Sequence, residues 1–109
     1  MATQASTVDF LIARVSDAGV VRSRKMFGEY ALYCDEKVVA LICDDKLFVK
    51  LTDAGRAFVG QLEEAPPYPG SKPYWLVEED RWENREWMTE LIRVTANALP
   101  VPKQKKARR

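Results

Sequence analysis

The sequence contains no histidine, and its only cysteines are Cys34 and Cys43. Histidine is the most frequent general base in enzymes, and a structural zinc site needs four nitrogen or sulfur ligands. The carboxylates, lysines, tyrosines and two thiols that remain form no recognisable catalytic arrangement. The composition therefore predicts a protein that is not an enzyme, with no catalytic residue, metal, cofactor or small-molecule substrate.

Long apolar segments are also missing. About 20 consecutive apolar residues are needed to span a bilayer, and no run of that length occurs. The N-terminal stretch MATQASTVDF lacks the basic and apolar regions of a secretory signal. We therefore expect a cytoplasmic protein without a membrane partner.

A general excess of basic charge is absent too, although the formal net charge is +1. Five of the 17 bases lie in the last seven residues, so residues 1–102 hold twelve bases against sixteen acids, a formal charge of −4. The folded part thus lacks the basic field that draws a domain onto nucleic acid. Contact with nucleic acid would be local and weak, through a cluster near the first strand and a basic tail; the candidate residues are Arg22, Arg24, Lys25, Lys103, Lys105, Lys106, Arg108 and Arg109.

The sequence does contain enough apolar residues, 47%, for one hydrophobic core. The patterns predict a single domain over residues 1–99 and a disordered basic tail over residues 100–109. Apolar residues at helical spacing predict helices over 7–18, capped by Ser6, and over 83–98. Between them, β-branched and aromatic runs predict a three-stranded antiparallel meander within 25–51, turning at Asp35-Glu36 and Asp44-Asp45.

The remaining segments complete an α+β fold. A short helix capped by Thr52 follows the meander, then a proline-rich surface loop and a fourth, edge strand over 74–77. The predicted element order is α-β-β-β-α-β-α. We expect two layers, with the helices packed on one face of the antiparallel sheet.

Alternation along the strands gives the predicted sheet two apolar faces. The predicted core face holds Phe27, Ala31, Tyr33, Val38, Ala40, Ile42, Leu47, Val49 and Leu51. The other face is too apolar for free solvent, and it is the candidate partner or dimer face; its residues are Met26, Tyr30, Leu32, Val39, Leu41 and Phe48, with Cys43 beside them. A protein partner, a second copy of the chain or a segment of the same chain could cover it, and we expect a homodimer.

Three other candidate sites have structural explanations. An RNA-stacking strand needs a second aromatic residue where this chain has Glu29. Cys34 and Cys43 would lie about 20 Å apart at ~3.3 Å per residue, too far for a disulfide, and we expect structural thiols. Trp75, Trp82 and Trp87 are expected to pack the last helix against the sheet rather than to line a pocket.

The stretch RSRKMFGEYALYCDEKVVALICDDKLFVKL, residues 22–51, resembles the signature of the TfoX/Sxy N-terminal domain, a bacterial family associated with the regulation of natural competence. The resemblance extends over roughly residues 7–99. It includes the segment DDKLFVKL and the segment PYWLV with the acidic helix start after it. The motif residues are Arg24, Met26, Phe27, Gly28, Leu32 and Tyr33.

This resemblance implies an α+β fold like that of secretion chaperones, in which such domains often pair. The full-length competence regulators carry a second, C-terminal helical domain to which no segment here corresponds, so we expect a stand-alone N-terminal domain. The leading hypothesis is a non-enzymatic regulatory or protein-interaction module related to regulators of competence and transcription. The alternative is a nucleic-acid-associated accessory factor that binds non-specifically through the basic tail and the 22–25 cluster.

Overall fold

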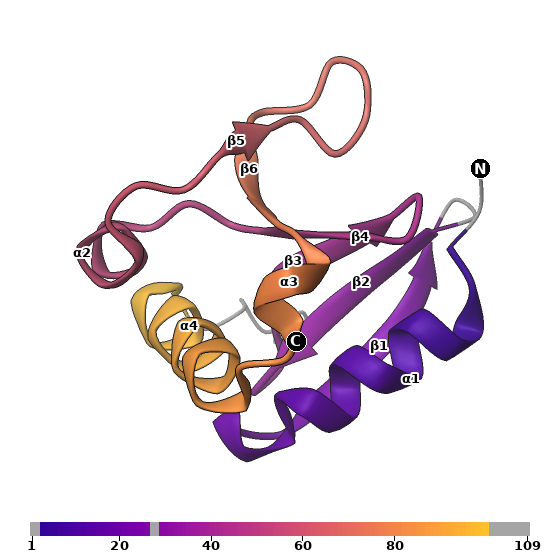
Figure 1. Ribbon diagram of the computed structural model, residues 1–109, viewed down its shortest axis with the longest axis horizontal. Helices are drawn as coiled ribbons and strands as arrows, with labels where there is room; N and C mark the ends of the chain where they lie inside the picture. The colour runs from indigo at the N-terminus through magenta and orange to yellow at the C-terminus, as the bar shows by residue number, and fades with distance from the viewer. Residues whose placement is uncertain (1–2, 27–28, 101–109) are drawn as a thin grey trace, which may run out of the picture.

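The computed structural model describes residues 3–26 and 29–100. Its centre is an antiparallel sheet of six strands in the spatial order β1-β2-β3-β4-β6-β5 (Figure 1). The strands are β1 (Val21–Met26), β2 (Glu29–Cys34), β3 (Lys37–Cys43), β4 (Lys46–Val49), β5 (Glu64–Ala65) and β6 (Tyr74–Val77). The predicted α+β class is confirmed, and the predicted strand count is wrong by two.

The segment predicted as the first strand of the meander contains the end of β1 and most of β2, which pair with each other as a hairpin. β1 and β2 pair with Met26 opposite Glu29, so the basic cluster lies within an edge strand instead of before one. The motif residues Phe27 and Gly28 lie outside the described residues. At the opposite edge of the sheet, β6 lies between β4 and β5. The strand over 74–77, predicted to be an edge strand, is therefore internal, and the two-residue β5 forms the edge.

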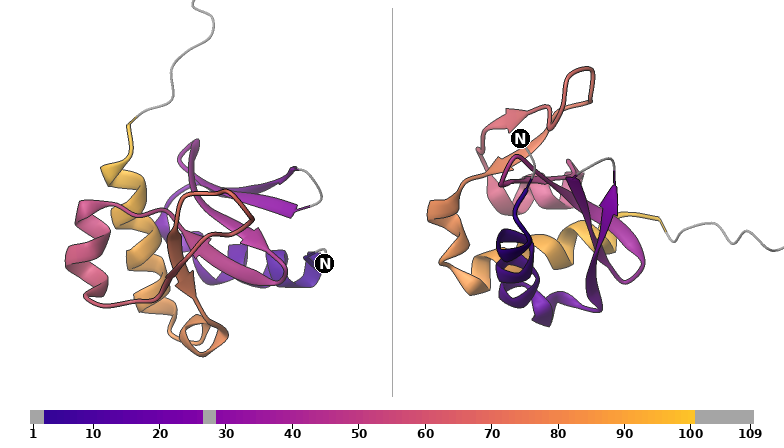
Figure 2. Two further views of the ribbon diagram at one scale, coloured as in Figure 1. Left: turned by 90° about the horizontal axis from the view of Figure 1, so that it is seen from above. Right: turned by 90° about the vertical axis from the view of Figure 1, so that its right-hand side faces the viewer.

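The helices supply the second layer. They are α1 (Ala5–Arg14), the 3-10 turn η1 (Ser16–Ala18), α2 (Asp53–Val59), α3 (Glu79–Trp82) and α4 (Arg85–Ala98). Figures 1 and 2 show α1 and α4 on the same side of the sheet. Among the described residues, no helix is long and apolar enough to cross a membrane.

A single buried cluster joins the two layers. Val8 and Leu11 of α1 and Leu91 of α4 pack with sheet residues such as Ile42 and Val49, all 3% exposed or less. Trp75 and Trp82 belong to this cluster, and Trp87 packs against it, as predicted. The prediction that none of them lines a pocket is wrong for Trp82, which also borders a surface cavity. The helices therefore cover one face of the sheet, and its other face looks away from them.

A β-bulge decides which residues of β2 face the helices. Tyr33 pairs with Val38 as the two-residue turn at Asp35-Glu36 requires, but Leu32 pairs with Ala40, so β3 has one extra residue at Val39. An extra residue in one strand reverses the face of everything beyond it. Leu32 and Val39 consequently lie in the core, both 0% exposed, and their predicted place on the partner face is wrong.

The N-terminus of α1 is held by a distant turn rather than by Ser6, which lies inside the helix. Both residues of the Asp44-Asp45 turn have positive φ, 54° and 59°. The Asp45 carboxylate accepts hydrogen bonds from the Gln4 backbone N–H (2.9 Å) and the Thr7 hydroxyl (3.0 Å). Because the acceptor comes from 41 residues away, the capping pattern in the local sequence could not reveal it.

Candidate functional site

The sheet face opposite the helices forms one wall of a groove of about 630 Å³. The loop between β5 and β6 forms the other wall, on the opposite side of the sheet from α1 (Figure 1). We call this feature the aromatic groove; its lining residues are Met26, Glu29, Tyr30, Leu41, Cys43, Asp44, Pro67, Tyr68, Pro69 and Tyr74.

A tight turn positions the exposed tyrosine of the groove. The Ser71 backbone N–H donates to the Tyr68 carbonyl at 3.1 Å, which closes a four-residue turn. Pro69 and Gly70 occupy its central positions, and Gly70 has a φ of +87°. Proline followed by a residue of positive φ is the type II arrangement, for which glycine is favoured. The turn presents Tyr68, whose exposed fraction is 56%, at the mouth of the groove.

The floor of the groove carries a thiol of low reactivity. Cys43 is 8% exposed, and burial, with the charges of Glu29 and Asp44, raises its pKa to about 11. Burial also raises the pKa of the Tyr74 hydroxyl. Since the thiolate is the nucleophilic form of cysteine, Cys43 stays protonated at neutral pH and acts as a small apolar surface.

The second cysteine has a purely structural position. Cys34 is fully buried in the core, and burial raises its pKa as well. Both thiols are free, as predicted from their spacing.

Glu29 closes one end of the groove through a hydrogen-bond network. One of its carboxylate oxygens accepts from the Thr3 backbone N–H at 3.0 Å and from the Thr3 hydroxyl, and the other accepts from the Asp44 N–H at 3.1 Å. Thr3 is 6% exposed, and its hydroxyl also accepts from the Asp45 N–H at 3.2 Å. Glu29 thus fastens the N-terminal segment to the β3–β4 turn.

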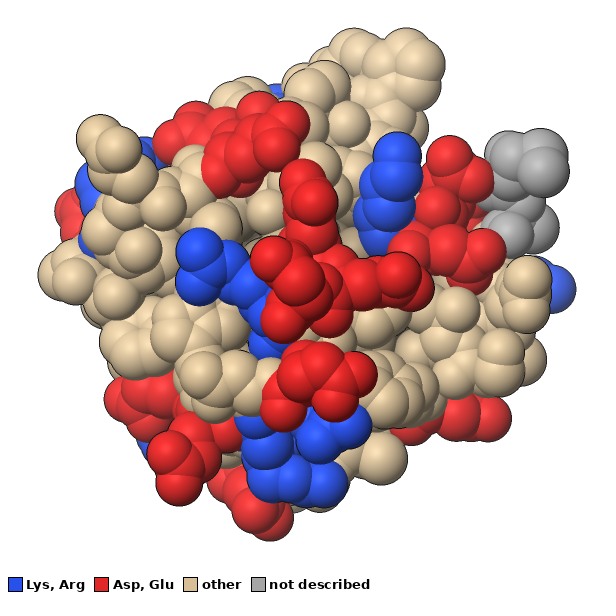
Figure 3. Space-filling view, in the orientation of Figure 1, with Lys and Arg blue, Asp and Glu red and all other residues tan. Residues whose placement is uncertain are grey.

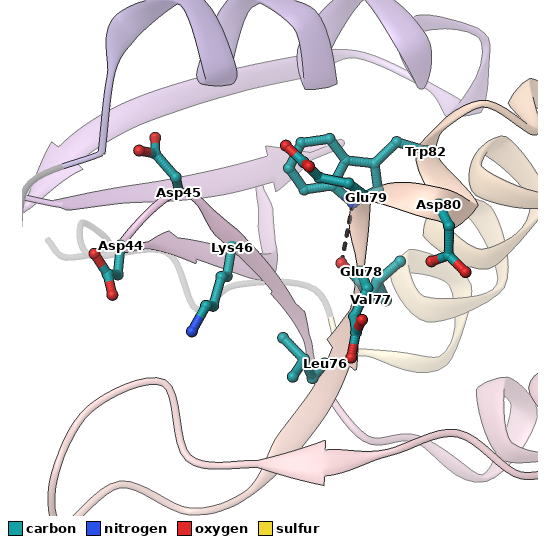
Figure 4. A pocket seen from close by; sticks show the side chains of 9 residues that line it. All are labelled: Asp44, Asp45, Lys46, Leu76, Val77, Glu78, Glu79, Asp80 and Trp82. Carbon is teal, nitrogen blue, oxygen red and sulfur yellow. Dashed lines mark hydrogen bonds between the residues drawn. The ribbon is translucent and has the colours of Figure 1, made fainter.

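Asp44 also lines a neighbouring cavity of about 500 Å³, which is rich in acids. Figure 3 shows the acidic side chains gathered over α3 and the adjacent end of the sheet. In Figure 4, Lys46 lies between the acids of the β3–β4 turn and those that follow β6. We call this the acidic cavity; its charged residues are Asp44, Asp45, Lys46, Glu78, Glu79 and Asp80.

The acidic cavity does not have the arrangement of a metal centre. Within the described ranges, no group of three or more cysteine or acidic side chains is placed to hold a metal ion. Its apolar wall consists of Leu76, Val77 and Trp82, and the Trp82 indole N–H donates to the Val77 carbonyl at 3.0 Å (Figure 4). The cavity therefore offers a negative potential beside an apolar surface, which suits a cationic side chain.

The structure brings together only part of the predicted partner face. Met26 and Leu41 line the aromatic groove. Tyr30 reaches its edge, but it shares the face of Leu32 on β2 and packs against the core cluster, so its predicted place on the partner face is also wrong. Phe48 faces the same side as Leu41, its partner across the strands, but it is only 6% exposed. Leu32 and Val39 are core residues, as described above. Sequence reasoning missed Tyr68 and Tyr74, and the one available signal was the presence of tyrosines within and next to a proline-rich loop.

The predicted basic cluster lies along the edge strand β1. Arg22 stacks over the Tyr33 ring, with 4.2 Å between the guanidinium carbon and the ring centre, and pairs with Glu36 at 3.1 Å. Arg24 and Lys25 are exposed. The tail candidates Lys103, Lys105, Lys106, Arg108 and Arg109, together with the predicted disorder of the tail, lie outside the described residues.

Comparison with known proteins agrees with the fold and with the motif. The chain is 49% identical over 108 residues to a Spirochaeta aurantia protein called an uncharacterized 12.7 kDa protein in trpE 5'region. That alignment covers 99% of this chain and 93% of the relative. The TfoX N-terminal domain family matches residues 13–99, which include β1, β2 and the whole aromatic groove. The chain belongs to the TfoX N-terminal domain family.

Proposed function

We propose that this protein is a non-catalytic protein-interaction module that binds its partner in the aromatic groove. The observation that carries the proposal is the groove itself, an apolar surface between the sheet face that looks away from the helices and the loop that carries Tyr68 next to Tyr74. Aromatic residues on such a surface supply large contact areas at a small cost in side-chain entropy. The protonated state of Cys43 supports a binding role over a nucleophilic one.

The first partner to test is a second copy of the chain. Self-association through an apolar face is a common way to cover it, and pairing is the expectation that the family resemblance gives. A regulatory role, such as the competence or transcription control associated with this family, would then operate through assembly and partner exchange.

Sedimentation velocity over a range of protein concentrations tests this function. We expect the wild-type chain to dimerise, and the double variant Tyr68→Ser, Tyr74→Ser, at two groove residues outside the core cluster, to stay folded by circular dichroism and to dissociate at least tenfold more readily. Val20→Ser is the matched control, because Val20 is 66% exposed and does not line the groove. Equal association of the groove variant and the wild type would refute the proposal.

A further inference from the structure

We propose that the occupant of the aromatic groove is the C-terminal segment, residues 100–109, of a second copy of this chain. The inference rests on the proposed function and makes it specific, because it names the segment that binds. It follows from the chemistry of the groove, the charge beside it, and the position at which the chain leaves α4.

The groove has the chemistry that favours a proline-containing ligand. Tyr68 and Tyr74 line it together with Pro67 and Pro69, and Tyr30 reaches its edge. Grooves lined by aromatic rings bind extended proline-rich segments, because such segments are already ordered in the polyproline conformation and lose little entropy on binding. The C-terminal segment begins Pro100-Val101-Pro102 and so offers two prolines in three residues.

The charge next to the groove complements the rest of that segment. Asp44 belongs to both the groove and the acidic cavity, so a ligand that leaves the groove at this end meets the acids of the cavity. Asp44, Glu78, Glu79 and Asp80 are exposed. The ion pairs within the described residues involve other acids, namely Glu36, Glu64 and Glu90.

The bases of the segment follow its prolines directly. Five lysines and arginines occupy positions 103–109, against four exposed acids and a single lysine around the cavity. An extended chain with Pro100 to Pro102 against the tyrosines would carry these bases toward the cavity, where opposite charge both speeds encounter and fixes the direction of binding.

The geometry of the fold separates this segment from the groove of its own chain. The Lys37 ammonium donates to the Ala96 carbonyl at 2.8 Å, so α4 ends beside the first residue of β3. Cys43, in the groove floor, lies six residues further along β3, about 20 Å away at ~3.3 Å per residue. The six residues from Ala96 to Pro102 span at most about 20 Å when fully extended, which leaves nothing for the passage around the sheet, because α4 packs on the face opposite the groove. The prolines therefore reach the groove of a neighbouring molecule.

A complementation experiment with the full-length chain tests the inference. The groove variant is Tyr68→Ser, in an exposed turn where loss of folding is not expected. The tail variant replaces Pro100 and Pro102 by alanine and the five bases of the tail by glutamine. The control for charge replaces Arg24 and Lys25, two exposed bases of β1, by glutamine.

We expect wild type and the charge control to dimerise, with an affinity that falls as salt increases, and each of the two variants alone to associate at least tenfold more weakly. An equal mixture of the variants should form a one-to-one complex, because each mixed pair keeps one intact groove and one intact tail. A mixture that associates no better than its components would overturn the inference. If the tail variant dimerises like the wild type while the groove variant does not, the groove binds without the tail and only the proposed function stands. If neither variant weakens association, or the wild type stays monomeric, the inference and the groove-mediated self-association both fail.

Discussion

At the scale of single residues, Gly55 shows a tertiary contact that overrides a local preference. Glycine weakens a helix interior, and from the sequence Gly55 makes α2 look marginal. In the structure, a Cβ atom at this position would lie 2.7 Å from the Trp75 ring, and Trp75 is fully buried. Thr52 caps the helix by accepting from the Gly55 N–H at 2.9 Å. The glycine is thus required by the packing of α2 on β6.

We predict that Gly55→Ala destabilises the protein by about 1–3 kcal/mol, the usual cost of overpacking a core. In an exposed helix the same change would stabilise by about 1 kcal/mol. Urea denaturation measures the difference. Ala57→Gly, at an exposed position of the same helix, is the control and should cost about 1 kcal/mol. An increase in stability for Gly55→Ala would show that Trp75 can move away.

Because the pKa of Cys43 is raised, we predict that the free energy of unfolding decreases at alkaline pH. This pKa is about 11 in the folded protein and its ordinary value is 9.0. Below pH 9 the thiol is protonated in both the folded and the unfolded state. Between pH 9 and 11 only the unfolded chain releases the proton, so stability falls as pH rises, by roughly 2–3 kcal/mol at most. Urea denaturation at pH 8 and pH 10.5 should show a smaller loss for Cys43→Ala than for Cys34→Ala. Equal losses in the two variants would contradict the assignment.

At the scale of elements, two turns made of consecutive acids connect β2 to β3 and β3 to β4. All four residues have positive φ, which costs L-amino acids about 1–2 kcal/mol each, and least for aspartate. Asp35 and Asp45 have compensating contacts, because Asp35 accepts from the Val20 N–H at 2.9 Å and Asp45 holds α1. Glu36 makes only a surface ion pair with Arg22.

We therefore expect Glu36→Gly to stabilise the protein by about 1 kcal/mol. Glycine is the preferred second residue of such a hairpin turn, and an exposed ion pair contributes little. Thermal and urea denaturation would report the gain. Glu36→Ala is the comparison, since it removes the ion pair and keeps the strain, and it should not stabilise. A loss of stability in the glycine variant would mean that the ion pair with Arg22 outweighs the strain.

The elements also show what the sequence can reveal. Periodicity predicted β3, β4, α2 and most of α1 and α4, because their apolar residues repeat clearly. β1 was missed because Arg22, Arg24 and Lys25 give it the charged composition of an edge strand. The bulge at Val39 leaves no mark in the local pattern, so the faces of β2 were reversed. The loop wall of the aromatic groove was also missed. The pairing of β5 with β6 positions that loop, and the two-residue β5 is too short to show a strand pattern in the sequence.

At the scale of the whole molecule, the charge is divided between an acidic body and a basic C-terminal segment. The alternative hypothesis is that the basic segment binds nucleic acid non-specifically. Because such binding would be purely electrostatic, it should depend steeply on salt concentration. We expect a complex with duplex DNA only at low salt and only through the tail. For five phosphate contacts, an increase from 50 to 200 mM salt should weaken the affinity by roughly 500-fold.

Fluorescence anisotropy with labelled duplex DNA measures this dependence. Replacing the five tail bases by glutamine should abolish the complex, and replacing Arg24 and Lys25 should leave most of it. Binding that survives loss of the tail charges, or that is insensitive to salt, would place the nucleic-acid contact on the folded body.

The contacts of α1 have a consequence for synthesis of the chain. Its N-terminus is held by Asp45, and the carbonyls of Ala13 and Arg14 at its other end accept hydrogen bonds from Arg85 and Thr89, more than 70 residues later. During synthesis, α1 thus meets its last partners only when α4 has been made. A ten-residue helix is too short to be stable alone in water, so α1 should stay largely unfolded until α4 is available. We therefore expect the domain to fold cooperatively, only after α4 has been synthesised.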